Sequence, residues 1–271
     1  MKYNNLNEAT IHVLGKYCNF LNELKTEYLI IGGWSPFLLN SNPIQHPGTR
    51  DVDVLFLEGA TPYALENIIK NNISNGYLLS AKHQFQLFEL LIVNDHEFVF
   101  NIDLMHPKES KMRGMFVDQL DLAVFLDKEQ TKRAKAKSII GPNTDILFNP
   151  LCNEEYTITY IDDDSHSKNC TIRLMNELGC ILTKAISCTK QKRERDSLDI
   201  FLAIKQARNY GKLIDSTNKL RSKSKEIVKA INEIKRAHQE NVLFPNIQLF
   251  IGISHEEYLH TMESFFADLT V

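Results

Sequence analysis

An Asp-x-Asp motif downstream of a glycine pair constrains this chain more than any other feature. An apolar segment typical of a strand ends at Gly32 and Gly33. Asp51 and Asp53 begin a second apolar segment, 51–57. Because side chains alternate faces along a strand, both carboxylates project to one side, about 7 Å apart. They repel each other unless a cation lies between them, so the motif predicts a site for a hard divalent cation such as Mg²⁺.

Two further features agree with a site for a metal and a phosphate. Without a Cβ atom, the glycine backbone can approach a phosphate closely, and its amides can donate to phosphate oxygens. Ser35 begins an expected short helix over 35–40 whose N-terminus also favours phosphate, although Ser35 is equally suited to capping that helix. A third acid, Asp103, lies near the end of the apolar segment 97–104 and shares a strand face with Asn101. In this order and spacing, these residues indicate one site rather than unrelated turns.

The glycine pair, the spacer and the Asp-x-Asp motif resemble the nucleotidyltransferase superfamily related to DNA polymerase beta. The resemblance implies that Asp51 and Asp53 hold Mg²⁺, or alternatively Mn²⁺, and that Asp103 completes the metal site. It also implies transfer of a nucleoside monophosphate from an NTP, such as ATP, to an acceptor hydroxyl, with release of pyrophosphate. The candidate nucleotide-binding residues of this region are Gly32, Gly33, Ser35, Thr49 and Arg50.

A second group of charged residues lies in the C-terminal half. Lys184 has apolar neighbours on an expected helix, and a lysine in such a place needs an anion, which a triphosphate would supply. Asp196 and Asp199 lie three residues apart, on one helical face. For Lys184 the alternative is a side chain that extends to the surface. For the two aspartates it is structural ion pairing with Arg193 or Arg195.

This second group resembles the AbiEii family of nucleotidyltransferases, the toxin half of a bacterial abortive-infection toxin–antitoxin pair. The resemblance covers roughly the first three quarters of the chain. It implies that Lys184 offsets charge on the triphosphate, and that Asp196 or Asp199 holds Lys184 or the ribose. It also implies an RNA acceptor, in related enzymes the 3′ end of tRNA, and a cognate antitoxin protein. One departure is that family members often carry an arginine where this chain has Pro47, whereas the arginine here is Arg50.

Two alternative functions remain open at this stage. The Gly-Gly-Trp sequence at the first motif also resembles small-molecule nucleotidyltransferases that modify aminoglycosides or lincosamides, which leaves the acceptor undecided. A non-catalytic nucleotide-binding or protein-interaction module is the other alternative, and the three intact carboxylates argue against it.

The charge of the chain is unevenly distributed. The net charge is −3, but residues 190–236 contain about 14 lysines and arginines against about 6 acidic residues. This segment therefore carries roughly +8 and the rest of the chain roughly −11. Such polarity suggests an anionic partner on one side, either nucleic acid or a nucleoside triphosphate, with a solvated helical face as the alternative.

Hydrophobic periodicity predicts an α/β (α+β) fold in two domains. Residues 1–150 are expected to form a nucleotidyltransferase domain, a mixed sheet with flanking helices, and residues 151–271 a mostly helical domain that closes the cleft. The expected helices are 6–25, 35–40, 62–70, 171–191, 194–210, 217–238 and 254–267. The expected strands are 28–31, 51–57, 77–79, 85–93 and 97–104, the last two joined as a hairpin around Asn94 and Asp95. The acidic run 162–164 is expected to be a surface turn rather than a metal site.

Composition is consistent with a cytoplasmic protein. The hydrophobic fraction of 43% and charged fraction of 24% are ordinary for a soluble globular protein. No apolar run approaches the roughly 20 residues that span a bilayer, and the first residues lack the apolar core of a signal peptide. The five cysteines are an odd number without metal-ligand spacing, so we expect reduced thiols. The sequence therefore predicts a cytoplasmic location and no membrane partner.

Overall fold

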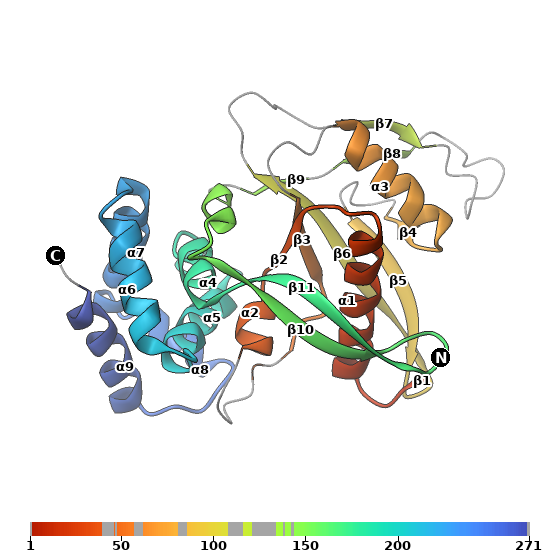
Figure 1. Cartoon of the computed structure of the whole chain (residues 1–271). Coiled ribbons are helices and arrows are strands. Elements are labelled where there is room, and N and C mark those ends of the chain that lie inside the picture. The colour runs from red at the N-terminus through yellow and green to blue at the C-terminus, as the bar shows by residue number, and fades with distance from the viewer. Residues whose placement is uncertain are drawn as a thin grey trace. The chain divides into compact units, whose positions relative to one another are not determined.

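The computed structural model shows a mixed α/β fold, as the sequence predicts (Figure 1). It describes residues 2–39, 46, 48–56, 62–80, 86–107, 116–120, 134–137, 139–141 and 144–269. Most of the expected loop 41–49 lies outside these residues. Within the described part of the chain, every helix is too short or too polar to cross a membrane.

The chain divides into two compact units that interleave along the sequence. Unit 1 comprises residues 1–31, 49–148 and 155–173, and unit 2 comprises residues 32–48, 149–154 and 174–271. The expected boundary at residue 150 falls inside a segment of unit 2. The assignment of a catalytic domain to 1–150 and a helical domain to 151–271 stays a prediction.

The main sheet mixes parallel and antiparallel strands. Its strands follow the order β1-β5-β6-β3-β2-β11-β10, with β4 paired to β5 and β9 paired to β6. The bounds are β1 Lys2–Tyr3, β2 Tyr28–Ile31, β3 Val52–Phe56, β4 Leu78–Leu79, β5 Gln86–Val93, β6 His96–Pro107, β9 Ile139–Gly141, β10 Asn153–Ile161 and β11 Ser167–Met175. A separate ribbon pairs β7 Phe116–Leu120 with β8 Ala134–Lys137.

The β5–β6 hairpin has a local cause in its turn. Asn94 and Asp95 both adopt left-handed backbone angles, with φ of 49° and 64°. Two such residues in succession form the tight turn whose twist matches the flanking strands, and Asn and Asp tolerate that conformation. The strands pair antiparallel from Val93 opposite His96 onward, so the predicted hairpin is confirmed.

Helix α1, Leu6–Glu23, packs against β1, β5 and the β10–β11 hairpin in unit 1 (Figure 1). Asn5 caps the helix by accepting a hydrogen bond from the backbone amide of Glu8. A glycine is required in mid-helix because a Cβ atom at Gly15 would lie 2.3 Å from the ring of Tyr160. The predicted helix over 6–25 is confirmed. It approaches β10 closely because Gly15 has no side chain.

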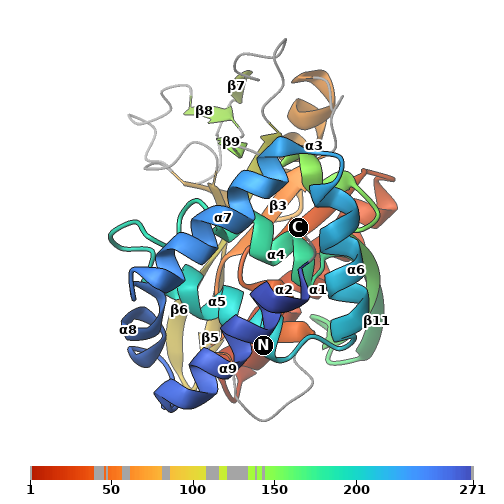
Figure 2. The ribbon, with the colours of Figure 1, turned by 90° about the vertical axis from the view of Figure 1, so that its left-hand side faces the viewer.

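The remaining helices belong mostly to unit 2. Helix α3, Pro62–Ser74, and the 3₁₀ turn Asp145–Phe148 lie in unit 1. The bounds in unit 2 are α2 Trp34–Leu38, α4 Glu177–Lys184, α5 Glu194–Lys205, α6 Tyr210–Arg221, α7 Lys225–Gln239, α8 Leu243–Gln248 and α9 His255–Asp268. Figure 2 shows α6, α7, α8 and α9 around α4 and α5. Residues 196–204 of α5 are all buried, so this helix forms the core of unit 2.

Three expected helices are wrong in part. The helix expected over 194–210 ends at Lys205, and the helix expected over 171–191 ends at Lys184. The segment 171–175 belongs to strand β11, and α4 begins only at Glu177, where Asn176 accepts from the amide of Gly179. Alternate residues of β11 are buried, a period of two that is too short here to be distinguished from a helical pattern. The expected helix 217–238 is two helices, because residues 222–224 interrupt the helical conformation between Arg221 and Lys225. The run 162–164 lies in the β10–β11 turn, as expected.

Candidate functional site

The three aspartates of the Asp-x-Asp region lie at neighbouring strands of unit 1. Strands β3 and β6 run parallel, and Asp53 lies directly opposite Asp103 in their register. Asp51 comes two residues before Asp53, immediately before β3 begins. The intervening Val52 is buried, whereas Asp51 is exposed and Asp53 and Asp103 are half-buried. Because neighbouring strands lie about 4.8 Å apart, the register places two carboxylates side by side on one face.

Side-chain amides hold two of these carboxylates. Asn101 Nδ2 donates to Asp51 Oδ1 at 3.1 Å, and Gln86 Nε2 donates to Asp103 Oδ1 at 2.8 Å. Gln86 is also the register partner of Asp103 on β5. Sequence reasoning missed Gln86, since its strand pairing with Asp103 has no local signal. These amides orient the carboxylates, which is the role that outer residues have around metal ligands.

The oxygen donors fit the metal that the resemblance implies. Three carboxylates on adjacent strands match the preference of Mg²⁺ and Mn²⁺ for hard oxygen ligands. The described residues contain two other groups of potential ligands, whose atoms lie within 4.8 Å of one another.

The glycine turn follows directly from the strand that pairs with the Asp-x-Asp motif. Ile31, the last residue of β2, lies opposite Asp53. Gly32 comes next, with a φ of 79°, in the left-handed region that favours glycine. On the other side of the motif, Thr49 Oγ1 donates to the backbone oxygen of Asp51 at 3.4 Å, and Arg50 is exposed. Phosphate binding by the glycines, Thr49 and Arg50 stays a prediction.

Ser35 does not cap helix α2. The N-cap is Gly33, and the helix covers Trp34–Leu38 instead of the expected 35–40. Ser35 is fully buried, and its Oγ has no hydrogen-bond partner among the described residues. An unsatisfied buried hydroxyl is uncommon and destabilising. The alternative of Ser35 as a helix cap is therefore wrong, and its role toward phosphate stays a prediction.

Unit 2 contains a buried network of charges around Lys184. Lys184 Nζ lies 2.9 Å from Asp196 Oδ1 and 2.5 Å from Asp199 Oδ2. Its side chain is 10% exposed, so the alternative of a lysine that extends to the surface is wrong. Arg193 Nε donates to Asp196 Oδ2 at 2.8 Å. The two aspartates supply the anions that Lys184 needs, which the sequence interpretation assigned to a triphosphate.

A histidine from a distant segment completes this network. His46 Nε2 lies 2.9 Å from Asp199 Oδ1, and His46 Nδ1 accepts from the backbone amide of Gly48. Arg195 Nη2 donates to the backbone oxygen of Gly48. Burial lowers the pKa of His46, against an opposing effect of Asp199, so the neutral ring donates from Nε2 to Asp199. Sequence reasoning missed His46, because 153 residues separate it from Asp199.

The network remains charged at neutral pH. Burial alone would raise the pKa of Asp199, but the charge of Lys184 and the hydrogen bond from His46 outweigh it and lower the pKa to about 2. Burial alone would lower the pKa of Lys184, but the negative charges of Asp199 and Asp196 outweigh the effect of burial. The pKa of Lys184 is therefore raised. The ion pairs of Lys184 join α4 to α5, and hydrogen bonds attach His46 and Gly48 to α5. Lys184 lies in unit 2 and the three aspartates lie in unit 1, so its action on a shared nucleotide stays a prediction.

Comparisons with known proteins add one finding. No protein-family profile matches the chain, and no curated protein matches it. Among solved structures, the chain is similar to an antigenic nucleotidyltransferase-like protein from Paracoccidioides brasiliensis, with a TM-score of 0.42 and 14% sequence identity. The match covers 92% of this chain and 96% of that chain. Function is therefore inferred from the residues of the site.

Proposed function

We propose that the protein is a metal-dependent nucleotidyltransferase with Asp51, Asp53 and Asp103 at its catalytic centre. The observation that supports this most is the parallel register of Asp53 opposite Asp103, with Asp51 two residues earlier. Three carboxylates on one face repel each other, so this arrangement persists best where a cation is bound. The left-handed Gly32 turn, directly after the strand that pairs with Asp53, supports a phosphate-bearing substrate.

The carboxylates would divide the chemistry between them. Asp51, Asp53 and Asp103 would hold Mg²⁺ or Mn²⁺, which when bound neutralises charge on the triphosphate. Asp103 would accept the proton of the acceptor hydroxyl while the hydroxyl oxygen attacks the α-phosphorus of the NTP. A new phosphodiester bond forms, the bond to the β-phosphate oxygen breaks, and pyrophosphate leaves. Gln86 and Asn101, which donate to Asp103 and Asp51, would keep the carboxylates in position.

The finer assignment is an RNA acceptor, with the 3′ end of tRNA first, and a role as the toxin of an AbiEii-like pair with a cognate antitoxin. The basic segment 190–236 supports an anionic macromolecule as acceptor. Lys184 is proposed to neutralise triphosphate charge, with Asp196 and Asp199 as the residues that hold it. An antitoxin gene next to that of this chain would support the toxin role.

A labelling experiment tests the activity. The purified chain is incubated with Mg²⁺, each labelled NTP in turn, and total tRNA, with and without an aminoglycoside or a lincosamide. Label in RNA supports the proposal, and label only in the small molecule supports the antibiotic-modifying alternative. Absence of label from every acceptor contradicts transfer and leaves the non-catalytic module as the better interpretation.

A matched pair of variants controls this experiment. Asp53→Asn removes one charge at the centre and should abolish labelling. Asp95→Asn makes the same change in the β5–β6 turn, where Asn tolerates the positive φ, and should leave labelling unchanged. Asp95 lies eight residues from Asp103, roughly 26 Å along an extended strand, so it is too distant to share the metal. Equal activity of wild type and Asp53→Asn would contradict the assignment.

A further inference from the structure

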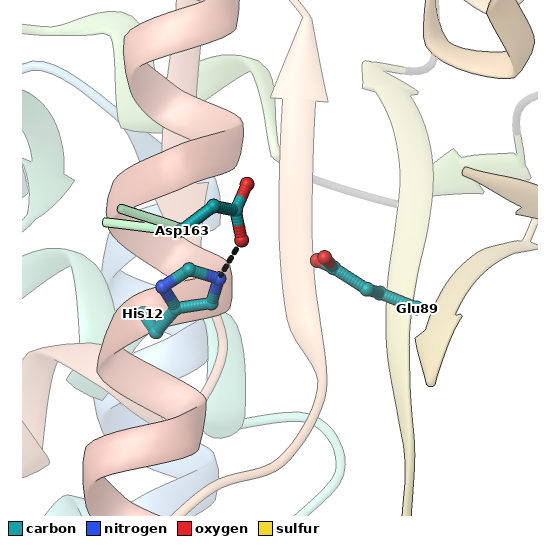
Figure 3. A group of neighbouring side chains, drawn as sticks. All are labelled: His12, Glu89 and Asp163. Carbon is teal, nitrogen blue, oxygen red and sulfur yellow. Dashed lines mark ion pairs between the residues drawn. The ribbon is translucent and has the colours of Figure 1, made fainter. Parts of the chain in front are cut away.

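A histidine and two carboxylates from three separate elements of unit 1 converge beside α1 (Figure 3). His12 lies on α1, Glu89 on β5, and Asp163 in the turn between β10 and β11. One potential ligand atom from each lies within 4.8 Å of the other two. The His12 side chain is 1% exposed and that of Asp163 is 61% exposed, so the group reaches from the interior to solvent.

The orientation of His12 leaves a lone pair aimed at this group. His12 Nδ1 lies 2.5 Å from the backbone oxygen of Ile161, and a carbonyl oxygen only accepts, so Nδ1 carries the proton. In the neutral ring Nε2 is then an acceptor. It lies 3.5 Å from Asp163 Oδ1, with which a protonated ring would form the ion pair drawn in Figure 3, and it has no hydrogen-bond partner among the described residues. A histidine whose other nitrogen donates to a backbone carbonyl is the usual arrangement at metal sites.

The net negative charge of the group also favours the binding of a further cation. Lys16 Nζ lies 2.6 Å from Glu89 Oε1 and 3.1 Å from Asp163 Oδ2, so it occupies one oxygen of each carboxylate. Glu89 Oε2 is buried and has no hydrogen-bond partner in the described part of the chain. One ammonium offsets one of the two carboxylates, which leaves a net charge of about −1 on Lys16, Glu89 and Asp163 together. A cavity of about 310 Å³ is lined by Lys16 and Asp163, whereas His12 and Glu89 are not among its lining residues.

The group lies apart from the catalytic aspartates. Glu89 and Gln86 are three residues apart on β5, so their side chains point to opposite faces of the sheet. Gln86 donates to Asp103, whereas Glu89 contacts Lys16 of α1. An ion bound beside α1 would therefore occupy a different face of the sheet from an ion at the three aspartates.

We propose that His12, Glu89 and Asp163 form a second metal site, which takes a divalent transition-metal ion of the zinc type. One imidazole nitrogen with two carboxylate oxygens suits Zn²⁺, whereas Mg²⁺ and Ca²⁺ prefer oxygen ligands alone. The bound ion ties the β10–β11 turn to α1 and β5, three segments that are far apart in sequence. Three protein ligands leave a fourth coordination position for water.

The second acidic group of this turn lacks the same features. Asp162, Asp164 and His166 also lie close together. Asp162 Oδ1 already accepts from the backbone amides of Asp164 and His166, and Asp162 Oδ2 lies 2.8 Å from Lys168 Nζ. These contacts satisfy Asp162 as part of the turn itself. The difference between these two groups identifies Asp163, rather than its neighbours in the turn, as the residue to test.

Cobalt titration of the full chain tests the site. Co²⁺ reports zinc-type ligands through visible absorption, and an Asp53→Asn background weakens binding at the catalytic aspartates. We expect one equivalent of Co²⁺ to bind, Zn²⁺ to displace it, and Zn²⁺ to raise the thermal unfolding midpoint. Asp163→Asn should weaken binding at least about 10-fold, as loss of a group at a metal site does.

Asp164→Asn is the matched control, since it makes the same change one residue away in the same turn. It should leave Co²⁺ affinity unchanged. His12→Gln should remove the nitrogen ligand and alter the absorption spectrum, and if that variant fails to fold, the exposed Asp163 still provides the test. Absence of Co²⁺ binding, or equal binding by Asp163→Asn and Asp164→Asn, would overturn the proposal.

Discussion

Replacement of Lys184 by methionine tests the buried charge network of unit 2. Methionine keeps much of the length and apolar character of the lysine stem but removes the ammonium that lies 2.9 Å from Asp196 and 2.5 Å from Asp199. Removal of one partner from a buried ion pair costs about 3–5 kcal/mol, because the other charge stays buried. Arg193 still contacts Asp196 and His46 still contacts Asp199, so we expect the lower end, about 3 kcal/mol.

The pH dependence of stability gives this prediction a second measurement. The pKa of Asp199 in the folded state is about 2, below its ordinary unfolded value of about 3.9. Its ionised carboxylate therefore contributes to the stability of the fold at pH values above about 3.9. The contribution, about 2–3 kcal/mol, is lost as the pH falls from about 5 toward 2. Lys184→Met removes the main opposite charge, so the variant should lose less stability over that range than the wild type does.

Urea unfolding at pH 7, followed by circular dichroism, measures the difference in unfolding free energy. Lys190→Met, an exposed lysine shortly after α4, is the control and should change stability by less than about 0.5 kcal/mol. Adding Asp199→Asn to Lys184→Met should recover at least about 1 kcal/mol, since it removes the charge left without its partner. A loss below about 1 kcal/mol for Lys184→Met, or no recovery in the double variant, would refute the reasoning.

Three further predictions concern the catalytic centre and α1. Asp53→Ala should abolish nucleotide transfer while the far-ultraviolet circular dichroism spectrum stays unchanged, and near-normal transfer would contradict the metal assignment. Asp103→Asn keeps the shape but removes the charge, so NTP affinity measured by calorimetry should fall less than the turnover number, whereas an equal loss of both would indicate a structural role. Gly15→Ala should destabilise the chain by about 1–2 kcal/mol in urea unfolding, because overpacking against Tyr160 outweighs the gain in helix propensity. Gly211→Ala in α6 is the matched helical control, because a Cβ atom there would meet only Asn209 Oδ1 at an ordinary 3.7 Å. This change should be neutral or stabilising. Equal effects of both changes would contradict the packing argument.

Local patterns were sufficient for much of the fold. The helix over 6–25, the strands around 28–31 and 51–57, and the hairpin at Asn94 and Asp95 all have causes within a few residues, such as apolar periodicity, a capping side chain or turn geometry. Strands β10 and β11 were missed for the same kind of reason. The alternation of β11 leads directly into α4, so sequence periodicity alone did not separate strand from helix there.

By itself, the sequence determined which chemistry-bearing residues share a strand or helix face, because the backbone repeat is local and fixed. It therefore placed Asp51 with Asp53, and Asp196 with Asp199. Only the tertiary structure decided which of these faces meet. The register of Asp53 against Asp103 spans about 50 residues, and the contact of His46 with Asp199 spans 153. Such pairings depend on the packing of the whole chain, which no local repeat encodes, and the convergence at His12 is therefore visible only in the folded protein.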